Sequence, residues 1–152
     1  MPFIRKIEAR AYARATEVTD RVADAILNVF PEETRQNVII TGERVEGQSG
    51  DEIVIFTGFL DSTEDCELTF DYILNNLKKS DRGTLRRTLD LRLSEKCVFF
   101  LRIDKQGAFL EKIRLADNAD VIRARIYFKD SPRCKPEDAI HFIEQRLLDT
   151  EA

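Results

Sequence analysis

The sequence predicts a two-layer α+β sandwich, in which helices pack on one face of a mostly antiparallel sheet and the other face stays partly open. Segments of two-residue periodicity and segments of helical periodicity follow in the order β-α-β-β-α-α-β-β-β-α. This order has too few crossover helices for a doubly wound parallel sheet, and a glycine-bearing loop between two strands indicates a hairpin. The 152 residues fit a single domain, residues 1–152, that is large enough to bury a core.

The first half of the chain contains three predicted strands and one predicted helix. The opening segment alternates between apolar and polar positions, which predicts a strand with one buried face. Its apolar positions are Ile7, Ala9, Ala11 and Ala13, and its polar positions are Lys6, Arg10, Tyr12 and Arg14. Thr16 is the expected N-cap of a helix that ends at Pro31. Strands are expected over Val38–Val45 and Ile53–Leu60, joined by the loop of residues 46–51.

The second half adds three predicted helices and three predicted strands. Ser62 or Thr63 can cap a helix whose apolar residues lie at helical spacing. These apolar residues are Cys66, Phe70, Ile73, Leu74 and Leu77. A short helix is expected over Asp81–Leu91, and the last helix is expected to start after Pro136. The strands between these two helices are predicted over Cys97–Ile103, Phe109–Leu115 and Val121–Lys129.

Composition favours a cytoplasmic protein that needs no cofactor. The three cysteines are odd in number and have no CxxC spacing, which argues against a disulfide framework or a zinc ribbon and favours a reducing compartment. The chain has no signal-like N-terminus and no apolar run long enough to cross a membrane. His141 is the only histidine, so no metal site is expected, and no glycine-rich nucleotide motif is present. No catalytic residue is assigned, and the protein is not expected to be an enzyme.

The distribution of charge is more informative than the net charge of −4, which argues against binding nucleic acid by total charge alone. If the strands share one sheet, the outward positions of that sheet are basic and aromatic. They are Lys6, Arg10, Tyr12, Arg14, Phe100, Arg102, Lys112, Arg114, Arg123, Arg125, Tyr127 and Lys129. Such a face could neutralise phosphates while its rings stack on unpaired bases, which predicts RNA binding. The same pattern also fits an ordinary sheet face in water.

A second basic group spans the end of one predicted helix and the start of the next. It comprises Lys78, Lys79, Arg82, Arg86 and Arg87. Arg82 and Arg86 lie four residues apart, so they share a helix face and could bracket a phosphate. The lysines also complement the negative end of a helix dipole, so a purely structural role is an alternative for them.

Residues 101–109, Leu-Arg-Ile-Asp-Lys-Gln-Gly-Ala-Phe, match an LR-x-DKQ-x-A-aromatic signature. With the loop of residues 46–50, the strand of residues 120–126 and the Ala-Thr-Glu of residues 15–17, they make the chain resemble an archaeal family of RNA-binding proteins described as predicted exosome subunits. The resemblance implies an α+β fold similar to that of the ribosomal protein that binds the small RNA of the large subunit. It also implies RNA and exosome or other RNA-processing proteins as partners.

One position departs from the family pattern, because the family usually continues its loop with Gly-Asn and here Asp51 follows Gly50. If that asparagine contacts RNA, an anionic side chain in its place weakens phosphate contact, so the loop is not assigned to the site.

The candidate RNA-binding residues combine the strand end that carries the signature with the open sheet face and the second basic group. They are Arg102, Lys105, Gln106, Arg123, Arg125, Arg10, Tyr12, Arg82 and Arg86. The cations are expected to bind phosphate, and Gln106 is expected to read a base edge or a 2′-hydroxyl. The alternative is a protein–protein adaptor or a homodimer without RNA affinity, in which Phe100 and Tyr127 anchor an interface.

Overall fold

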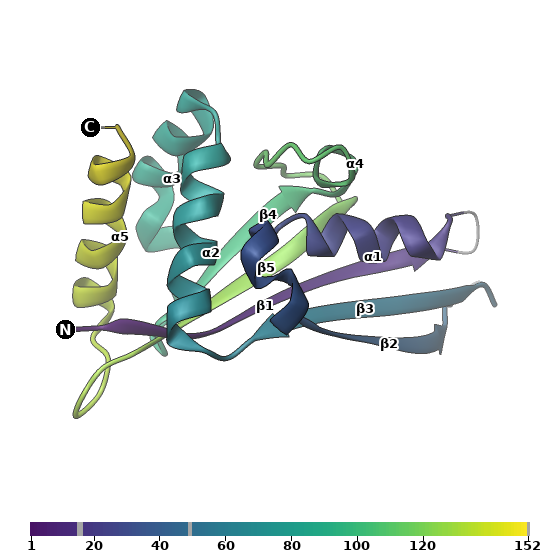
Figure 1. The fold of residues 1–152 in the computed structure, drawn as a ribbon, viewed down its shortest axis with the longest axis horizontal. Coiled ribbons are helices and arrows are strands. Elements are labelled where there is room, and N and C mark those ends of the chain that lie inside the picture. The colour runs from purple at the N-terminus through teal and green to yellow at the C-terminus, as the bar shows by residue number, and fades with distance from the viewer. Residues whose placement is uncertain (15–16, 49, 152) are drawn as a thin grey trace.

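A five-stranded antiparallel sheet forms one layer of the protein and helices form the other (Figure 1). The structure is a computed structural model, and it describes residues 1–14, 17–48 and 50–151. The elements are β1 (Phe3–Arg14), α1 (Thr19–Leu27), the 3-10 helix η1 (Glu32–Asn37), β2 (Ile39–Glu46), β3 (Glu52–Leu60), α2 (Thr63–Asn76), α3 (Lys79–Arg92), β4 (Val98–Asp104), α4 (Lys105–Phe109), β5 (Val121–Lys129) and α5 (Pro136–Glu151). The strand order is β2-β3-β1-β5-β4, which confirms the predicted fold class.

Strand β1 lies at the centre of the sheet, where it pairs with β3 on one side and β5 on the other. Its alanines at positions 9, 11 and 13 are buried, and these small side chains let α1 lie close to the sheet. Gly58 in β3 has the same effect, since a β-carbon there would lie 2.8 Å from Cγ2 of Ile26. The pairing with β5 shifts between Ile4 and Lys6, so Arg5 is an extra residue in a β-bulge.

A cluster of phenylalanines fills the core where α2 and α5 cover the sheet. The Phe70 ring lies 6.5 Å from Phe99 and 6.3 Å from Phe128 between ring centroids, with both pairs edge-to-face. Phe142 of α5 completes the cluster at 5.3 Å from Phe128. Edge-to-face rings at these distances gain energy beyond the area they bury, so this cluster fixes α2 and α5 on the sheet.

Most predicted elements are confirmed. The side chain of Ser62 caps α2 by accepting a hydrogen bond from the Asp65 amide at 3.5 Å, and the predicted apolar stripe of that helix is buried. The hairpin of β2 and β3 and the strand at residues 121–129 also form as expected. Helix α1 begins at Thr19, and the predicted cap Thr16 lies outside the described residues.

The strand predicted over Phe109–Leu115 is wrong. Residues 105–109 form the short helix α4, because the Asp104 carboxylate accepts a hydrogen bond from the Gly107 amide at 2.9 Å and so caps a helical turn. A β-carbon at position 107 would lie 3.0 Å from Oδ2 of Asp104 and 3.1 Å from the Lys112 carbonyl oxygen, so any larger residue would crowd this cap. At the end of this segment, Leu115 forms an isolated antiparallel bridge to Ile103 of β4.

The structure also contains one disulfide, which the argument against a disulfide framework did not anticipate. Cys97, just before β4, is joined to Cys134, just before α5, by a disulfide that spans 37 residues of sequence. An odd count argues against a disulfide framework but does not exclude one pair, and the fold brings these two α-carbons to 6.3 Å. The third cysteine, Cys66, is free and buried, and burial raises the pKa of its thiol to about 12. None of the helices in the described part of the chain is long and apolar enough to span a membrane.

Candidate nucleic-acid interface

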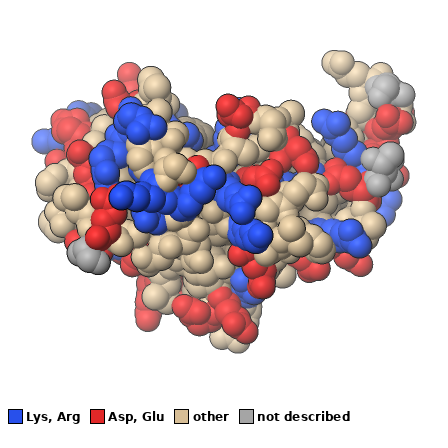
Figure 2. Space-filling model, turned by 90° about the horizontal axis from the view of Figure 1, so that it is seen from above, with Lys and Arg blue, Asp and Glu red and all other residues tan. Residues whose placement is uncertain are grey.

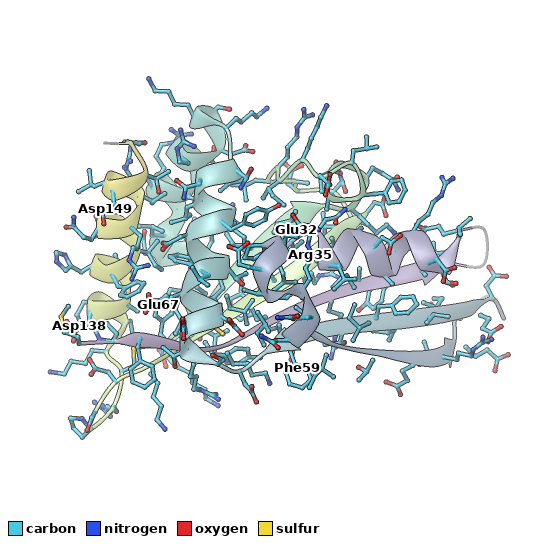
Figure 3. The ribbon with its side chains drawn as sticks, viewed as in Figure 1. Glu32, Arg35, Phe59, Glu67, Asp138 and Asp149 are labelled. Atoms are coloured by element: carbon cyan, nitrogen blue, oxygen red, sulfur yellow. A yellow bond between two sulfur atoms is a disulfide. The ribbon has the colours of Figure 1, made fainter. Side chains whose placement is uncertain are left out.

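The face of the sheet away from the helices carries five of the predicted site residues. Along β1, β4 and β5 the apolar positions are buried under the helices, so the alternate positions point to the open side. These five residues are Arg10, Tyr12, Arg102, Arg123 and Arg125. Phe59 of β3 lies on this side as well, below the sheet in Figure 3, whereas the labelled acids Glu67 and Asp149 lie on the helices. The sequence therefore placed the faces of these strands correctly.

Three arginines form a row across neighbouring strands. Arg123 of β5 lies directly opposite Arg10 of β1 on one side and opposite Arg102 of β4 on the other. Like charges at directly opposed positions destabilise a sheet. No ion pair with a described residue neutralises any of the three. The row therefore presents concentrated positive charge from the centre of the open face to its β4 edge.

Aromatic rings lie between these cations. The Arg123 guanidinium lies 5.6 Å from the centroid of the Tyr12 ring, and Arg125 lies 5.7 Å from that of Phe100. The bulge adds a third cluster, because Arg5 and Lys6 both face Tyr127, at 5.2 and 5.1 Å. Tyr12 and Phe100 are 39% and 40% exposed, so each ring still offers a surface to a ligand. The open face thus combines cations for phosphate with rings for bases.

Arg102 lies at the edge of this face and is held in place by the segment that follows α4. Its Nη2 donates a hydrogen bond to the Asn118 carbonyl oxygen at 2.7 Å, while its buried Nε has no partner among the described residues. Arg92, at the end of α3, lies close enough for the two charges to interact. Burial and then the positive charge of Arg102 lower the pKa of the Arg92 guanidinium.

Lys105 does not extend into solvent, although the sequence suggested a phosphate contact. Its side chain is only 6% exposed, and its Nζ lies 2.8 Å from a Glu17 carboxylate oxygen and 2.6 Å from one of Asp120. It also donates to the Tyr12 carbonyl oxygen at 3.0 Å. The ammonium group therefore joins the end of β1 to the segments before α1 and before β5.

Gln106 is exposed beside this cluster, with its amide donating to Asp120 at 3.3 Å. Burial alone would raise the pKa of Asp120, but the hydrogen bonds from Lys105 and Gln106 outweigh burial and lower it. Gln106 thus lies on α4, where it lines a pocket beside α1, and its amide is already engaged with a carboxylate. Its role in reading a base stays a prediction.

Arg82 and Arg86 lie on α3 in the helical layer, away from the open sheet face. Arg82 donates to the carbonyl oxygen of Leu77 at the end of α2, and Arg86 pairs with Glu151 of α5 at 2.9 Å. Both therefore have structural partners, and the structure does not bring them together with the arginine row.

The sequence missed Arg5 and Phe59 as members of the open face. Arg5 shares a side with Lys6 only because of the bulge, which strict alternation cannot reveal. Phe59 lies within a nearly continuous apolar strand, where alternation gives no signal. The described residues contain no group of three His, Cys, Asp or Glu side chains that could hold a metal ion.

Comparison with known proteins shows which family the chain resembles. Residues 6–128 match a protein-family model described as RNA binding. The RNA-binding protein PAB1135 of Pyrococcus abyssi is 28% identical over 93% of this chain and 92% of its own length. The uncharacterized protein MJ0213 of Methanocaldococcus jannaschii is 30% identical over 95% of this chain and 98% of its own length.

Solved archaeal structures share the fold. The protein AF2318 of Archaeoglobus fulgidus, described as DUF54, matches with a TM-score of 0.80 and 25% identity over 94% of this chain and 99% of its own. Mth689 of Methanothermobacter thermautotrophicus, also a DUF54 protein, matches with a TM-score of 0.71 and 26% identity over 95% of this chain and 98% of its own. The family model covers most of the chain, and it includes the five strands apart from the ends of β1 and β5. This chain therefore belongs to the RNA-binding family that the model describes.

Proposed function

We propose that this protein binds single-stranded RNA on the open face of its sheet and acts by binding, without catalysis. The observation that carries the proposal is the row formed by Arg10, Arg123 and Arg102. A row of unpaired like charges destabilises the free protein, and a bound polyanion would relieve that repulsion. The family match supports RNA as the polyanion.

The rings beside the row favour an unpaired strand over a duplex. Bases in an A-form helix are stacked on one another, so Tyr12 and Phe100 could not reach their faces. In a single strand the bases are free to stack on exposed rings while the arginines bind the phosphates. The cation beside each ring would add its own attraction to a stacked base.

The acidic residues of helices α1 and α2 support the same face. The protein has a net charge of −4, and helices α1 and α2 carry acids such as Asp20, Glu64 and Glu67. A phosphate chain is repelled from acidic helices and attracted to the arginine row, so electrostatics would orient the protein on RNA.

The resemblance carried by residues 101–109 extends the proposal to RNA processing or degradation, with an archaeal exosome as partner. Affinity purification of the protein from an archaeal cell, followed by mass spectrometry with and without ribonuclease treatment, tests this part separately. Recovery of exosome subunits after ribonuclease treatment supports a protein contact. Recovery that depends on intact RNA indicates that RNA bridges the two.

Fluorescence anisotropy with short single-stranded and duplex RNAs tests the binding itself. The variant Arg123→Glu with Arg125→Glu is expected to lose most of its affinity for single strands. A matched control is Arg133→Glu with Lys135→Glu, which makes the same charge change in the exposed loop at the far end of β5. Equal affinities of the two variants would overturn the sheet-face site. If the wild-type protein does not bind RNA but forms a stable dimer in light scattering, the protein–protein adaptor is favoured instead.

A further inference from the structure

A second basic surface lies on the helix side of the molecule. A depression of about 310 Å³ opens between the α2–α3 turn and the segment after α4, and its lining includes Lys78, Lys112 and Arg114. All three side chains are exposed, and none forms an ion pair with a described residue. Seen from above, Lys and Arg gather in a band across the middle of this surface (Figure 2). The lining therefore carries three cations against one carboxylate, that of Glu111.

The carboxylates near the depression do not cancel this charge. Glu111 lines it, but its carboxylate also faces Arg35 at 3.9 Å. The Asp81 carboxylate accepts a hydrogen bond from the Leu115 amide at 3.0 Å, which ties the segment after α4 to α3. This bond fixes the basic segment against the helix, so the depression is part of the packed fold.

The outer edge of β4 connects this surface to the arginine row. The Ala116 amide donates to the Arg102 carbonyl oxygen at 3.0 Å, and the Asp104 amide donates to that of Arg114 at 2.8 Å. Residues 114–116 therefore run antiparallel beside β4. With ordinary strand spacing, the α-carbons of Arg114 and Arg102 are about 8 Å apart. That separation is about one Debye length at physiological salt, so the two charges act on the same stretch of a polyanion.

Resting on the proposed function, we infer that bound RNA continues from the open sheet face over the outer edge of β4 into this depression, where Lys112 and Arg114 bind its phosphates. The two basic surfaces then form one path around β4. A short RNA fills only the sheet face, and a longer RNA gains affinity by reaching the depression.

Anisotropy with oligouridines of about 4 to about 16 nucleotides, the range of site sizes of single-strand-binding domains, tests this path. The variant Lys112→Glu with Arg114→Glu is expected to bind the shortest RNA like the wild type. For longer RNAs, its affinity is expected not to rise with length as that of the wild type does. The affinity for the longest RNA should be about tenfold lower for each lost phosphate contact. The slope of log affinity against log salt for the longest RNA should fall by about 1.4, that is, about 0.7 for each of two phosphates.

The control Arg133→Glu with Lys135→Glu makes the same charge change away from the path and should keep the wild-type dependence on length. If both variants lose affinity equally, general repulsion explains the effect and the path is refuted. If Lys112→Glu with Arg114→Glu matches the wild type at every length, the path is refuted while the sheet-face site stands. Wild-type protein that binds no RNA of any length refutes the proposed function itself. Circular dichroism checks that both variants fold, and glutamine at the same positions replaces glutamate if one does not.

Discussion

Replacing Lys105 by methionine separates a structural role of this residue from a role in RNA contact. The side chain is 6% exposed, and its Nζ lies 2.8 Å from a carboxylate oxygen of Glu17 and 2.6 Å from one of Asp120. Breaking a fully buried ion pair by removing one partner costs about 3–5 kcal/mol. Here the carboxylates are 25% and 49% exposed and regain water, so we expect a loss of about 2–3 kcal/mol. For a domain of this size that loss lowers Tm by roughly 5–10 °C.

The pH dependence of this loss has a definite sign. The pKa of Asp120 is lowered in the folded protein, so its pairing with Lys105 stabilises the fold above the unfolded pKa of about 4. That stability is lost as the pH falls through the folded pKa. The stability difference between wild type and Lys105→Met should therefore be largest near neutral pH and should shrink toward pH 3.

Urea unfolding followed by circular dichroism at several pH values measures this difference, and NMR titration follows the Asp120 carboxyl directly. Asp120→Asn and the double variant complete a cycle, in which a coupling of about 0.5–3 kcal/mol is expected for groups in contact. The reasoning is refuted if Lys105→Met unfolds like the wild type while its RNA affinity falls. That result would mean that Lys105 leaves its carboxylates to bind phosphate.

Three further predictions concern the open face and the disulfide. Phe100→Leu should weaken the binding of single-stranded RNA by about 1–3 kcal/mol, because the stacking of a base on the ring is lost. Duplex RNA is the comparison, and an equal loss of affinity for both RNAs would argue against stacking. Arg123→Gln removes the central charge of the row, so RNA affinity should fall while Tm stays level or rises; a lower Tm would show that the arginine stabilises the fold. Cys97→Ser opens a loop of 37 residues and should cost about 3–4 kcal/mol in urea unfolding, and an unchanged midpoint would show that the link contributes nothing.

The buried and exposed faces of the strands could be predicted because the alternation of apolar and polar residues along a strand shows which of its faces is buried. Over residues 7–14 of β1 and 122–126 of β5, small or apolar side chains alternate with mostly polar ones, so alternation separates buried alanines and isoleucines from exposed arginines. The arginine row needs more than this alternation, because β1, β5 and β4 must also be adjacent and must pair in one register. Their register was not predictable from periodicity, and it is the register that puts Arg123 opposite both Arg10 and Arg102.

The environment of Lys105 could not be predicted, because its partners come from distant parts of the chain. Glu17 lies 88 residues away, and a charged residue after a strand usually points to water. Helix α4 was not predicted for a similar reason. An apolar residue such as Phe109 fits a strand as well as a helix, and the hydrogen bond from the Gly107 amide to Asp104 favours the helix. Long-range pairing and single capping bonds leave little trace in periodicity.

The arginine row and the Lys105 cluster show two ways in which this fold handles positive charge. Lys105 is surrounded by carboxylates and helps to hold the edge of the sheet together. Arg10, Arg123 and Arg102 oppose one another across the sheet with no carboxylate between them, although the chain has more acidic than basic residues. An acidic chain has carboxylates available to pair with these positions, and stability alone would favour such pairing. The absence of any ion pair between this row and a described residue is therefore the observation on which the proposal of an RNA-binding surface on the open face rests.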